Sequence, residues 1–321
     1  MSRAGMEPHP QETAKEKNRK DTVTTIPTAN YALIGGSGTW GARFPEDLEM
    51  PNVELTDYFE AFDTPFGRTA PFKLLRIGGQ NVLRTAMHGM WDHGGGQGSR
   101  PRTPWLAAKQ VGWVLEQAGV QWAMVEASVG GIQRPDRPGE PLPPWSITIN
   151  TDYMMFFRPD DDQPFFGGRK RSARFKDPFC SIMSEHLYQA AKKEPKFAGI
   201  YKDAVYVCTA WGRFETAKEI QVYAEMGAHV VGHTLAHELP VFRKAGVRLA
   251  SVGIISNHAE GRDEWVGDNP DAMADFYFSC PHYLGPVMAN AMQALIESGV
   301  TPPEDPDIYL YGLGQFPVEG A

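Results

Sequence analysis

Short apolar runs alternate with segments of helical spacing along most of this sequence, and this alternation restricts the fold more than any other feature. From Val120 onward, strand-like runs at 120–125, 204–209 and 247–255 are separated by helix-like segments. Such alternation predicts an α/β protein. With 321 residues, of which 42% are hydrophobic, the chain can bury the core of one large domain.

The individual elements follow from the same patterns. Helical spacing or helix-ending glycines predict helices at 105–117, after Cys180 through 191, and at 220–226, 239–245 and 283–296. Further strands are predicted at 31–34, 146–149 and 230–232, and antiparallel or mixed strands at 53–87.

The ends of the chain differ from its middle. Residues 1–28 are polar and rich in Lys, Glu, Thr and Pro, so we expect a disordered N-terminal tail. The folded domain is predicted to span residues 29–300, and a Pro-rich C-terminal tail follows at 301–321. Inside the domain, the charged segment 160–176 predicts an exposed excursion.

Charge and cysteine content argue against several classes of protein. A formal net charge of -8 disfavours a nucleic-acid-binding surface, because binding to phosphate backbones needs clustered Lys and Arg. Cys180, Cys208 and Cys280 lie far apart and indicate neither a disulfide framework nor a zinc ribbon. No apolar run approaches the roughly 20 residues that cross a bilayer, and no signal-like stretch begins the chain. A cytoplasmic protein without membrane or nucleic-acid partners is therefore expected.

Two strand-like runs end in small, Gly-rich turns that would bring backbone N–H groups close to a ligand. The first run leads into Gly35-Gly36-Ser37-Gly38, and the second into Glu126-Ala127-Ser128-Val129-Gly130-Gly131. Glycine lets the chain turn tightly with its N–H groups toward an anion, and Ser37 adds a hydroxyl. A tight turn without a ligand is an equally weighted interpretation of the first motif.

A second set of ligand-binding groups lies in the stretch 211–261. Phe214 and Glu215 follow the strand at 204–209, and Asn257 follows the strand at 247–255. A planar heterocycle binds by stacking on an aromatic ring and by edge hydrogen bonds, and an amide with a carboxylate suits the edge of a lactam purine. The alternative is that Glu215 is a surface helix residue and Asn257 a turn residue.

Other types of site find less support. His229, His233 and His237 recur every fourth residue, as metal ligands on a helix face would. The strand-like run at 230–232 places His229 outside that helix, so no metal site is expected. A serine-hydrolase elbow needs GxSxG and a dinucleotide site needs GxGxxG, and the GGSGTW run at 35–40 has neither spacing.

The order and spacing of the motifs together resemble the trimeric purine nucleoside phosphorylase and methylthioadenosine phosphorylase family, over roughly residues 31–296. The motifs are GGSG at Gly35, HG at His88, the turn through 128–131, DPFC at Asp177, GRFETAKE at Gly212, GAHVVGHT at Gly227, HE at His237 and IISNHAEG at Ile254. The resemblance implies a single α/β domain whose central mixed, twisted β-sheet is partly barrel-like and flanked by helices. It also implies cleavage of a nucleoside with phosphate as co-substrate, and no metal or organic cofactor.

The resemblance further implies roles for individual residues. Phosphate-site positions are matched by Ser37, His88, Ala127, Ser128 and Thr234. Positions that contact the rest of the substrate are matched by Phe214, His233, Ser128, Val129 and Gly130. Asn257, Glu215 and His88 are the candidate catalytic residues, with Asn257 stabilising the charge that develops on purine N7.

The same positions imply a preference among the bases. Phe214 matches the ring that packs on the purine, and Glu215 and Asn257 match the pair that reads 6-oxopurines. Methylthioadenosine phosphorylases typically have Asp at the position of Asn257 and a hydroxyl residue at that of Glu215. Hypoxanthine or guanine is therefore expected as the base, in a nucleoside with or without a modified 5′ group.

Several positions depart from the family pattern. Met87 and Met90 flank the HG motif where the family has a phosphate-clamping arginine, and Trp211-Gly212, His233 and His237-Glu238 replace its GP, Met and PE. A guanidinium makes the strongest kind of phosphate hydrogen bond, so its loss weakens phosphate binding unless Arg100 or Arg102 supplies the charge. Three hypotheses therefore stand: a phosphorylase, a hydrolase that uses water, and a redirected or binding scaffold.

Resemblance to the family also implies an oligomer. The segment 152–157 gathers Tyr153, two Met and two Phe residues, a composition typical of a core or a subunit interface. By resemblance this segment lies near a neighbour's pocket in a homotrimer or homohexamer.

Overall fold

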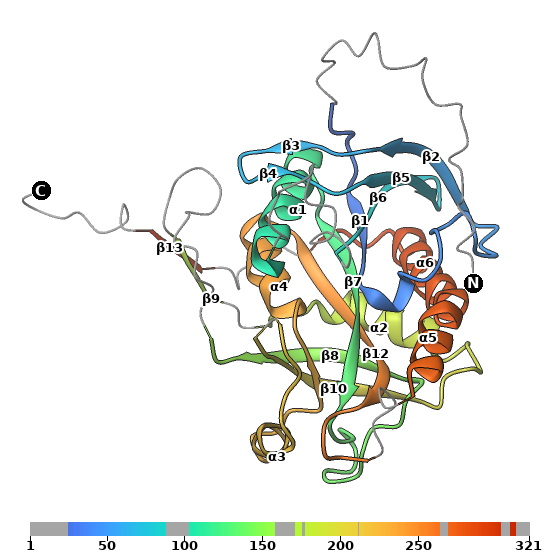
Figure 1. The fold of residues 1–321 in the computed structure, drawn as a ribbon. Coiled ribbons are helices and arrows are strands. Elements are labelled where there is room, and N and C mark those ends of the chain that lie inside the picture. Colours follow the sequence, from blue (N-terminus) through green and yellow to red (C-terminus); the bar gives the residue numbers. More distant parts are fainter. Residues whose placement is uncertain are drawn as a thin grey trace, which may run out of the picture.

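The computed structural model describes residues 25–87, 103–157, 171–174, 177–210, 212–263, 269–302 and 309–312, with only the backbone of 171–174 and 309–312. Figure 1 shows a central sheet with helices packed on both sides of it. The α/β class predicted from the alternation of runs is confirmed.

Strands of the described chain assemble into one large sheet in the order β11-β10-β8-β12-β7-β1-β6-β5-β2. In sequence order these strands are β1 (Tyr31–Gly35), β2 (Val53–Phe59), β5 (Phe72–Ile77), β6 (Gln80–Ala86), β7 (Trp122–Gly131), β8 (Ser146–Met155), β10 (Gly199–Cys208), β11 (Val230–Gly232) and β12 (Arg248–His258). Parallel pairs include β1 with β6 and β7, whereas β12 runs antiparallel to β8. The sheet is therefore mixed.

One half of this sheet curls toward closure. The short strand β11 pairs with β10 in parallel and also with β7 in antiparallel fashion. Strands β11, β10, β8, β12 and β7 thus form a ring, while β1, β6, β5 and β2 extend from it as an open sheet. The partly barrel-like mixed sheet implied by the resemblance is confirmed, and the strands at 53–87 are antiparallel to one another.

Helices cover the sheet from two sides. They are α1 (Pro104–Ala118), α2 (Ser181–Ala191), α3 (Ala217–Glu225), α4 (Leu235–Lys244), α5 (Pro270–Ser279) and α6 (Pro281–Glu297), with a short 3-10 turn η1 (Ser37–Thr39). Helices α1 and α4 pack together over one face, and α2 and α6 over the other (Figure 1). Each pair buries its own apolar cluster against the sheet, so the core consists of two layers.

The predicted helices exist, but α3 and α4 begin three and four residues earlier than their apolar spacing indicated. Helix α3 begins at Ala217 because Thr216 caps it: the Thr216 hydroxyl accepts from the Glu219 N–H, and the Glu219 carboxylate accepts from the Thr216 N–H. Helix α4 begins at Leu235 and contains Pro240, so His237 and Glu238 are helical residues. Gly227 has a φ of +92°, as expected of a residue that ends a helix.

Some elements were not predicted. Helix α5 was missed, and β8 continues six residues beyond the predicted end at 149, to Met155. Strand β9 (Arg171–Arg174), inside the expected exposed excursion, pairs antiparallel with β13 (Tyr309–Gly312), inside the expected C-terminal tail. Two further short strands, β3 (Asp63–Thr64) and β4 (Gly67–Arg68), pair with each other. Among the helices of the described ranges, none has the length and apolar character needed to span a membrane.

Candidate functional site

A cavity of about 440 Å³ opens where several strands end, and it contains every predicted site residue that the structure describes. These residues are Ser37, Ala127, Ser128, Val129, Gly130, Phe214, Glu215, His233, Thr234 and Asn257. His88, Met90, Arg100, Arg102 and Trp211 lie outside the described residues. Met87 also lines the cavity and is 2% exposed, so an apolar side chain stands at the position next to His88.

The sheet topology explains why residues so far apart in the sequence meet here. Strands β1, β7 and β12 are parallel neighbours, and β10 and β11 are parallel to each other. The carboxyl ends of parallel strands meet at one edge of a sheet, which is where open α/β folds bind ligands. Ser37 follows β1, Glu215 follows β10, Thr234 follows β11, and Asn257 lies at the end of β12.

Asn257 owes its position to an irregularity in its strand. The register between β12 and β7 shifts between Ile255 and Asn257, which places Asn257 opposite Gly130. Such a bulge re-aims the side chain that follows it. The Asn257 Oδ1 accepts from the Ser256 hydroxyl at 2.7 Å, and its Nδ2 donates to the His258 carbonyl at 2.8 Å. An amide NH₂ carries two hydrogens, so the second one remains available to the cavity.

Glu215 lines the same cavity as Asn257 and lies among polar partners that the sequence did not indicate. The Thr209 hydroxyl donates to Glu215 Oε1 and lies 3.2 Å from His233 Nδ1. His233 Nε2 is 3.9 Å from Glu215 Oε1, and the rings of His233 and Phe214 meet edge to face at 5.9 Å. Glu215 is buried and Phe214 exposed, so the carboxylate forms the floor and the ring forms the rim.

The Gly-rich turn after β1 is occupied by a carboxylate of the chain itself. Glu126 Oε1 accepts from the Gly36 N–H at 2.5 Å, from the Thr39 N–H at 3.0 Å and from the Thr39 hydroxyl at 2.8 Å. The Arg84 guanidinium donates to the Thr39 hydroxyl at 2.8 Å, which links Arg84 to Glu126 through Thr39. Arg84 lines a second cavity on the other side of this turn rather than the cavity that contains Asn257.

Helix α4, which follows Thr234, carries two buried ionisable groups below the cavity. Glu238 is 2% exposed, and burial, reinforced by the nearby Glu126, raises its pKa to about 8. His237 is 4% exposed and packs against the rings of Trp105 and Phe157, and burial lowers its pKa to about 4. Both groups are therefore neutral in the folded protein near pH 7.

The three histidines of the candidate metal face have separate environments. His229 lies before β11, and its Nδ1 accepts from the Val205 N–H at 2.9 Å. His233 faces the cavity, and His237 lies in the core. The strand at Val230–Gly232 that separates His229 from the helix is confirmed, and the part of the chain described above contains no cluster of three metal-ligating side chains.

Sequence reasoning missed Thr209, Glu126 and the residues of α5. Helix α5 contributes Met273 and Tyr277 to the cavity, and the Tyr277 hydroxyl lies 3.2 Å from the Ser128 hydroxyl. The sequence does carry a signal for its start, because Asn followed by Pro at 269–270 is typical of a helix N-terminus. In the structure the Asn269 side chain accepts from the Ala272 N–H. The partners of Thr209 and Glu126 had no comparable local signal.

Comparison with known proteins identifies the family. Residues 30–297 match the model of the phosphorylase superfamily. The S-methyl-5′-thioadenosine phosphorylase of Thermococcus kodakarensis is 26% identical over 75% of this chain and 82% of its own length. The 6-oxopurine nucleoside phosphorylase of Pyrococcus furiosus is 28% identical over 72% of this chain and 80% of its own length. A probable S-methyl-5′-thioinosine phosphorylase of Thermodesulfovibrio yellowstonii is 30% identical over 71% of this chain and 77% of its own length.

Solved structures agree on the fold. A methylthioadenosine phosphorylase from an antarctic soil metagenomic library superimposes with a TM-score of 0.68 at 20% identity, over 85% of this chain and 88% of that one. With the superfamily match covering most of the sequence, this chain belongs to the phosphorylase superfamily, in the pentosyltransferase family of purine nucleoside and methylthioadenosine phosphorylases.

Proposed function

We propose that this protein cleaves the N-glycosidic bond of a 6-oxopurine nucleoside with phosphate as the nucleophile and without a metal or organic cofactor. The observation that carries the proposal is the convergence of Phe214, Glu215 and Asn257 on one cavity from two separate places in the chain, after β10 and at the end of β12. Relatives named as 6-oxopurine nucleoside phosphorylases support the class of base and of nucleophile.

The arrangement of polar groups suits a 6-oxopurine in one orientation. The free hydrogen of the Asn257 amide is a donor for N7 or O6, and the Glu215 carboxylate is an acceptor for N1–H. Glu215 Oε1 already accepts from Thr209, which leaves Oε2 for the base. Phe214 supplies the aromatic face at the rim.

The reaction then requires little beyond positioning and electrostatics. The C1′–N9 bond breaks, its electron pair passes into the purine, and a phosphate oxygen forms the new bond to C1′. Asn257 donates to the base as negative charge builds up on N7, so its hydrogen bond strengthens toward the transition state. His233 lies between Glu215 and Thr234, where the sugar would connect the base to the nucleophile.

Hydrolysis is the second candidate, because Met87 lines the cavity and Glu126 takes two N–H groups of the Gly-rich turn. One assay separates the two reactions. Purified protein is incubated with inosine, guanosine and their 5′-deoxy-5′-thio analogues, with and without phosphate, in ¹⁸O-labelled water. Phosphorolysis predicts phosphate-dependent release of hypoxanthine or guanine together with a sugar 1-phosphate. Equal release without phosphate, with label on the sugar, would establish hydrolysis instead.

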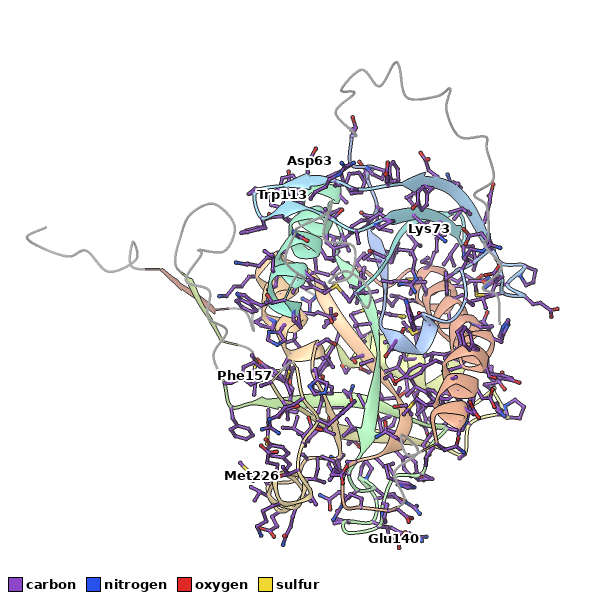
Figure 2. All side chains as sticks on the ribbon, in the orientation of Figure 1. Asp63, Lys73, Trp113, Glu140, Phe157 and Met226 are labelled. Atoms are coloured by element: carbon purple, nitrogen blue, oxygen red, sulfur yellow. The ribbon has the colours of Figure 1, made fainter. Side chains whose placement is uncertain are left out.

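We further propose that the protein assembles as a homotrimer or homohexamer. Several large apolar side chains are exposed near the end of β8 and on or just after α3, namely Phe156 (58%), Val222 (40%) and Met226 (51%). The rings of Phe156 and Tyr223 stack at 6.1 Å and join the two elements into one surface. Figure 2 shows Phe157 and Met226 on the same side of the molecule. Such a patch is typical of a protein interface.

Multi-angle light scattering at micromolar concentration is therefore expected to give three or six times the chain mass of 35.6 kDa. Replacing Phe156 by Asp should shift the mass toward the monomer, because a carboxylate in an apolar interface loses its hydration without gaining a partner. Lys218→Glu, an exposed change on α3 outside the apolar set, is the control. A monomeric wild-type protein would contradict the proposal.

A further inference from the structure

The Gly-rich turn at 35–39 has the shape of an anion site, but two of its backbone N–H groups and one hydroxyl already have a partner. Successive backbone N–H groups in such a turn form a concave site that suits phosphate or carboxylate. Here the N–H groups of Gly36 and Thr39 both donate to Glu126 Oε1, and so does the Thr39 hydroxyl. The anion bound in this turn is therefore a side chain of the protein.

Neighbouring residues enclose the Glu126 side chain on several sides. It lies on β7 opposite Val252 of β12, and only 2% of it is exposed. A Cβ placed on Gly38 would meet Glu126 Oε2 at 2.7 Å, Ile254 at 2.8 Å and Leu284 at 2.9 Å, so the side chain is wedged between the turn and the apolar core. Oε2 has no hydrogen-bond partner within the described residues. A carboxylate enclosed in this way cannot swing out to make room for another anion.

Arg84, the cation linked to Glu126 through a hydrogen-bonded hydroxyl, lies away from the proposed substrate site. Arg84 is buried, and it reaches Glu126 through the Thr39 hydroxyl. Its guanidinium also donates to the Thr85 carbonyl and lies 4.8 Å from the centre of the Phe44 ring. Arg84 thus reaches the Glu126 hydrogen-bond network from behind the turn, while Gly36 and Ser37 line the cavity in front of it.

A second acidic side chain is buried near Glu126. Glu238 lies in the first turn of α4, the helix that begins after Thr234. It is close enough to Glu126 for the two carboxyls to interact. Because Glu238 is neutral near pH 7, a phosphate dianion between Ser37 and Thr234 would be opposed mainly by the Glu126 carboxylate, which has also taken the Gly36 and Thr39 N–H groups. Water or a neutral hydroxyl meets no such repulsion.

We propose that Glu126 determines nucleophile specificity: by filling the 35–39 turn, it makes phosphate a weak ligand and admits water to C1′. The inference rests on the proposed function in placing the nucleophile beside this turn. It predicts that part of the turnover is hydrolytic, with water forming the new C1′–O bond and giving one proton to solvent while the purine leaves.

Two substitutions at Glu126 separate its charge from its hydrogen bonds. Glu126→Gln keeps the volume and an acceptor for the turn but removes the charge, whereas Glu126→Thr also frees the Gly36 and Thr39 N–H groups. Inorganic phosphate is titrated into each protein by calorimetry. We expect at least fivefold tighter phosphate binding by Glu126→Gln and at least tenfold by Glu126→Thr, with a matching fall in the hydrolytic share of turnover.

Glu238→Gln is the matched control, because it removes a buried carboxyl from the same region without touching the turn. Its gain in phosphate affinity should be smaller than that of Glu126→Gln. If Glu126→Thr does not fold, Glu126→Gln decides alone. Phosphate affinities within twofold of wild type in the folded variants, or submillimolar binding by wild type that Glu126→Gln does not improve, would overturn the proposal.

The proposed function is checked separately in the same proteins. Hypoxanthine is titrated into wild type and both Glu126 variants, and its affinity should be unchanged because Glu126 does not line the cavity. A wild-type protein that neither binds purine nor cleaves any of the nucleosides would contradict the proposed function. The phosphate titrations would still show whether Glu126 excludes anions from the turn.

Discussion

Replacing Asn257 by Ala is expected to lower kcat for inosine cleavage by about 100- to 1000-fold. A single well-placed donor to developing negative charge is typically worth about 3 kcal/mol in the transition state. The Asn257 amide is held by Ser256 and His258 on either side, so its remaining hydrogen is fixed in direction before substrate binds. Because the bond strengthens as N7 gains charge, KM should change far less than kcat.

Asn257→Asp is the informative companion, because the carboxyl keeps the shape of the amide. An adenine edge presents an N6 amino donor beside N7, and a carboxyl can accept from that group while an amide NH₂ opposes it. Activity on inosine should fall, while activity on adenosine relative to inosine should rise at least tenfold. Steady-state kinetics with both nucleosides measure this.

Ser256→Ala serves as the control for Asn257, because it removes only the hydroxyl that orients the amide. We expect a loss of less than tenfold. Unfolding temperatures within a few degrees of wild type would show that each variant is folded. An Asn257→Ala enzyme with more than a third of wild-type kcat would rule out a catalytic role for this side chain.

The second large effect concerns stability rather than rate. Glu238→Gln is expected to stabilise the protein at pH 8 by several kcal/mol and to change little at pH 4. Burial holds the pKa of Glu238 at about 8 in the folded state, against an ordinary value of 4.5. The folded protein therefore keeps a proton that the unfolded chain loses above pH 4.5, and wild-type stability falls as pH rises from about 4.5 to about 8.

Each unit of pKa shift changes the free energy of unfolding by about 1.4 kcal/mol. Glutamine never ionises, so the variant loses the dependence of stability on pH that Glu238 causes. His237 acts in the opposite sense, because its pKa is lowered to about 4. It favours the folded state increasingly as pH rises from about 4 to 6.5, so the effect of Glu238 should be clearest between pH 6.5 and 8. Glu126, whose pKa burial also raises, would leave a residual slope in the variant.

Urea unfolding at pH 4, 6.5 and 8 measures the effect. Glu225→Gln, at an exposed position of α3, is the control and should follow wild type at every pH. Parallel pH profiles for wild type and Glu238→Gln would mean that Glu238 is hydrated in solution and that its buried position does not persist.

Much of the fold could be predicted because its signals are local. Apolar runs of strand length, the Gly-rich ends of β1 and β7, and the glycine after α3 are read from neighbouring residues. The errors also have local causes. Helix α3 starts at a polar capping box, and α4 contains Pro240, so apolar spacing alone placed both starts too late. Helix α5 was not predicted, although the Asn269-Pro270 pair indicates a helix start.

The sequence by itself determined the α/β class and the three groups proposed to contact the base, Phe214, Glu215 and Asn257, because each lies close to the end of a recognisable strand. Tertiary structure alone decided what those groups and the Gly-rich turn contact. Glu126 and the Gly36 N–H are 90 positions apart, and Tyr277 and Ser128 are 149 apart. Hydrogen bonds act over about 3 Å in space, whereas sequence spacing reports only the neighbours within one helix turn or strand. The turn that resembles a phosphate site in the sequence is, in the folded protein, a site filled by Glu126.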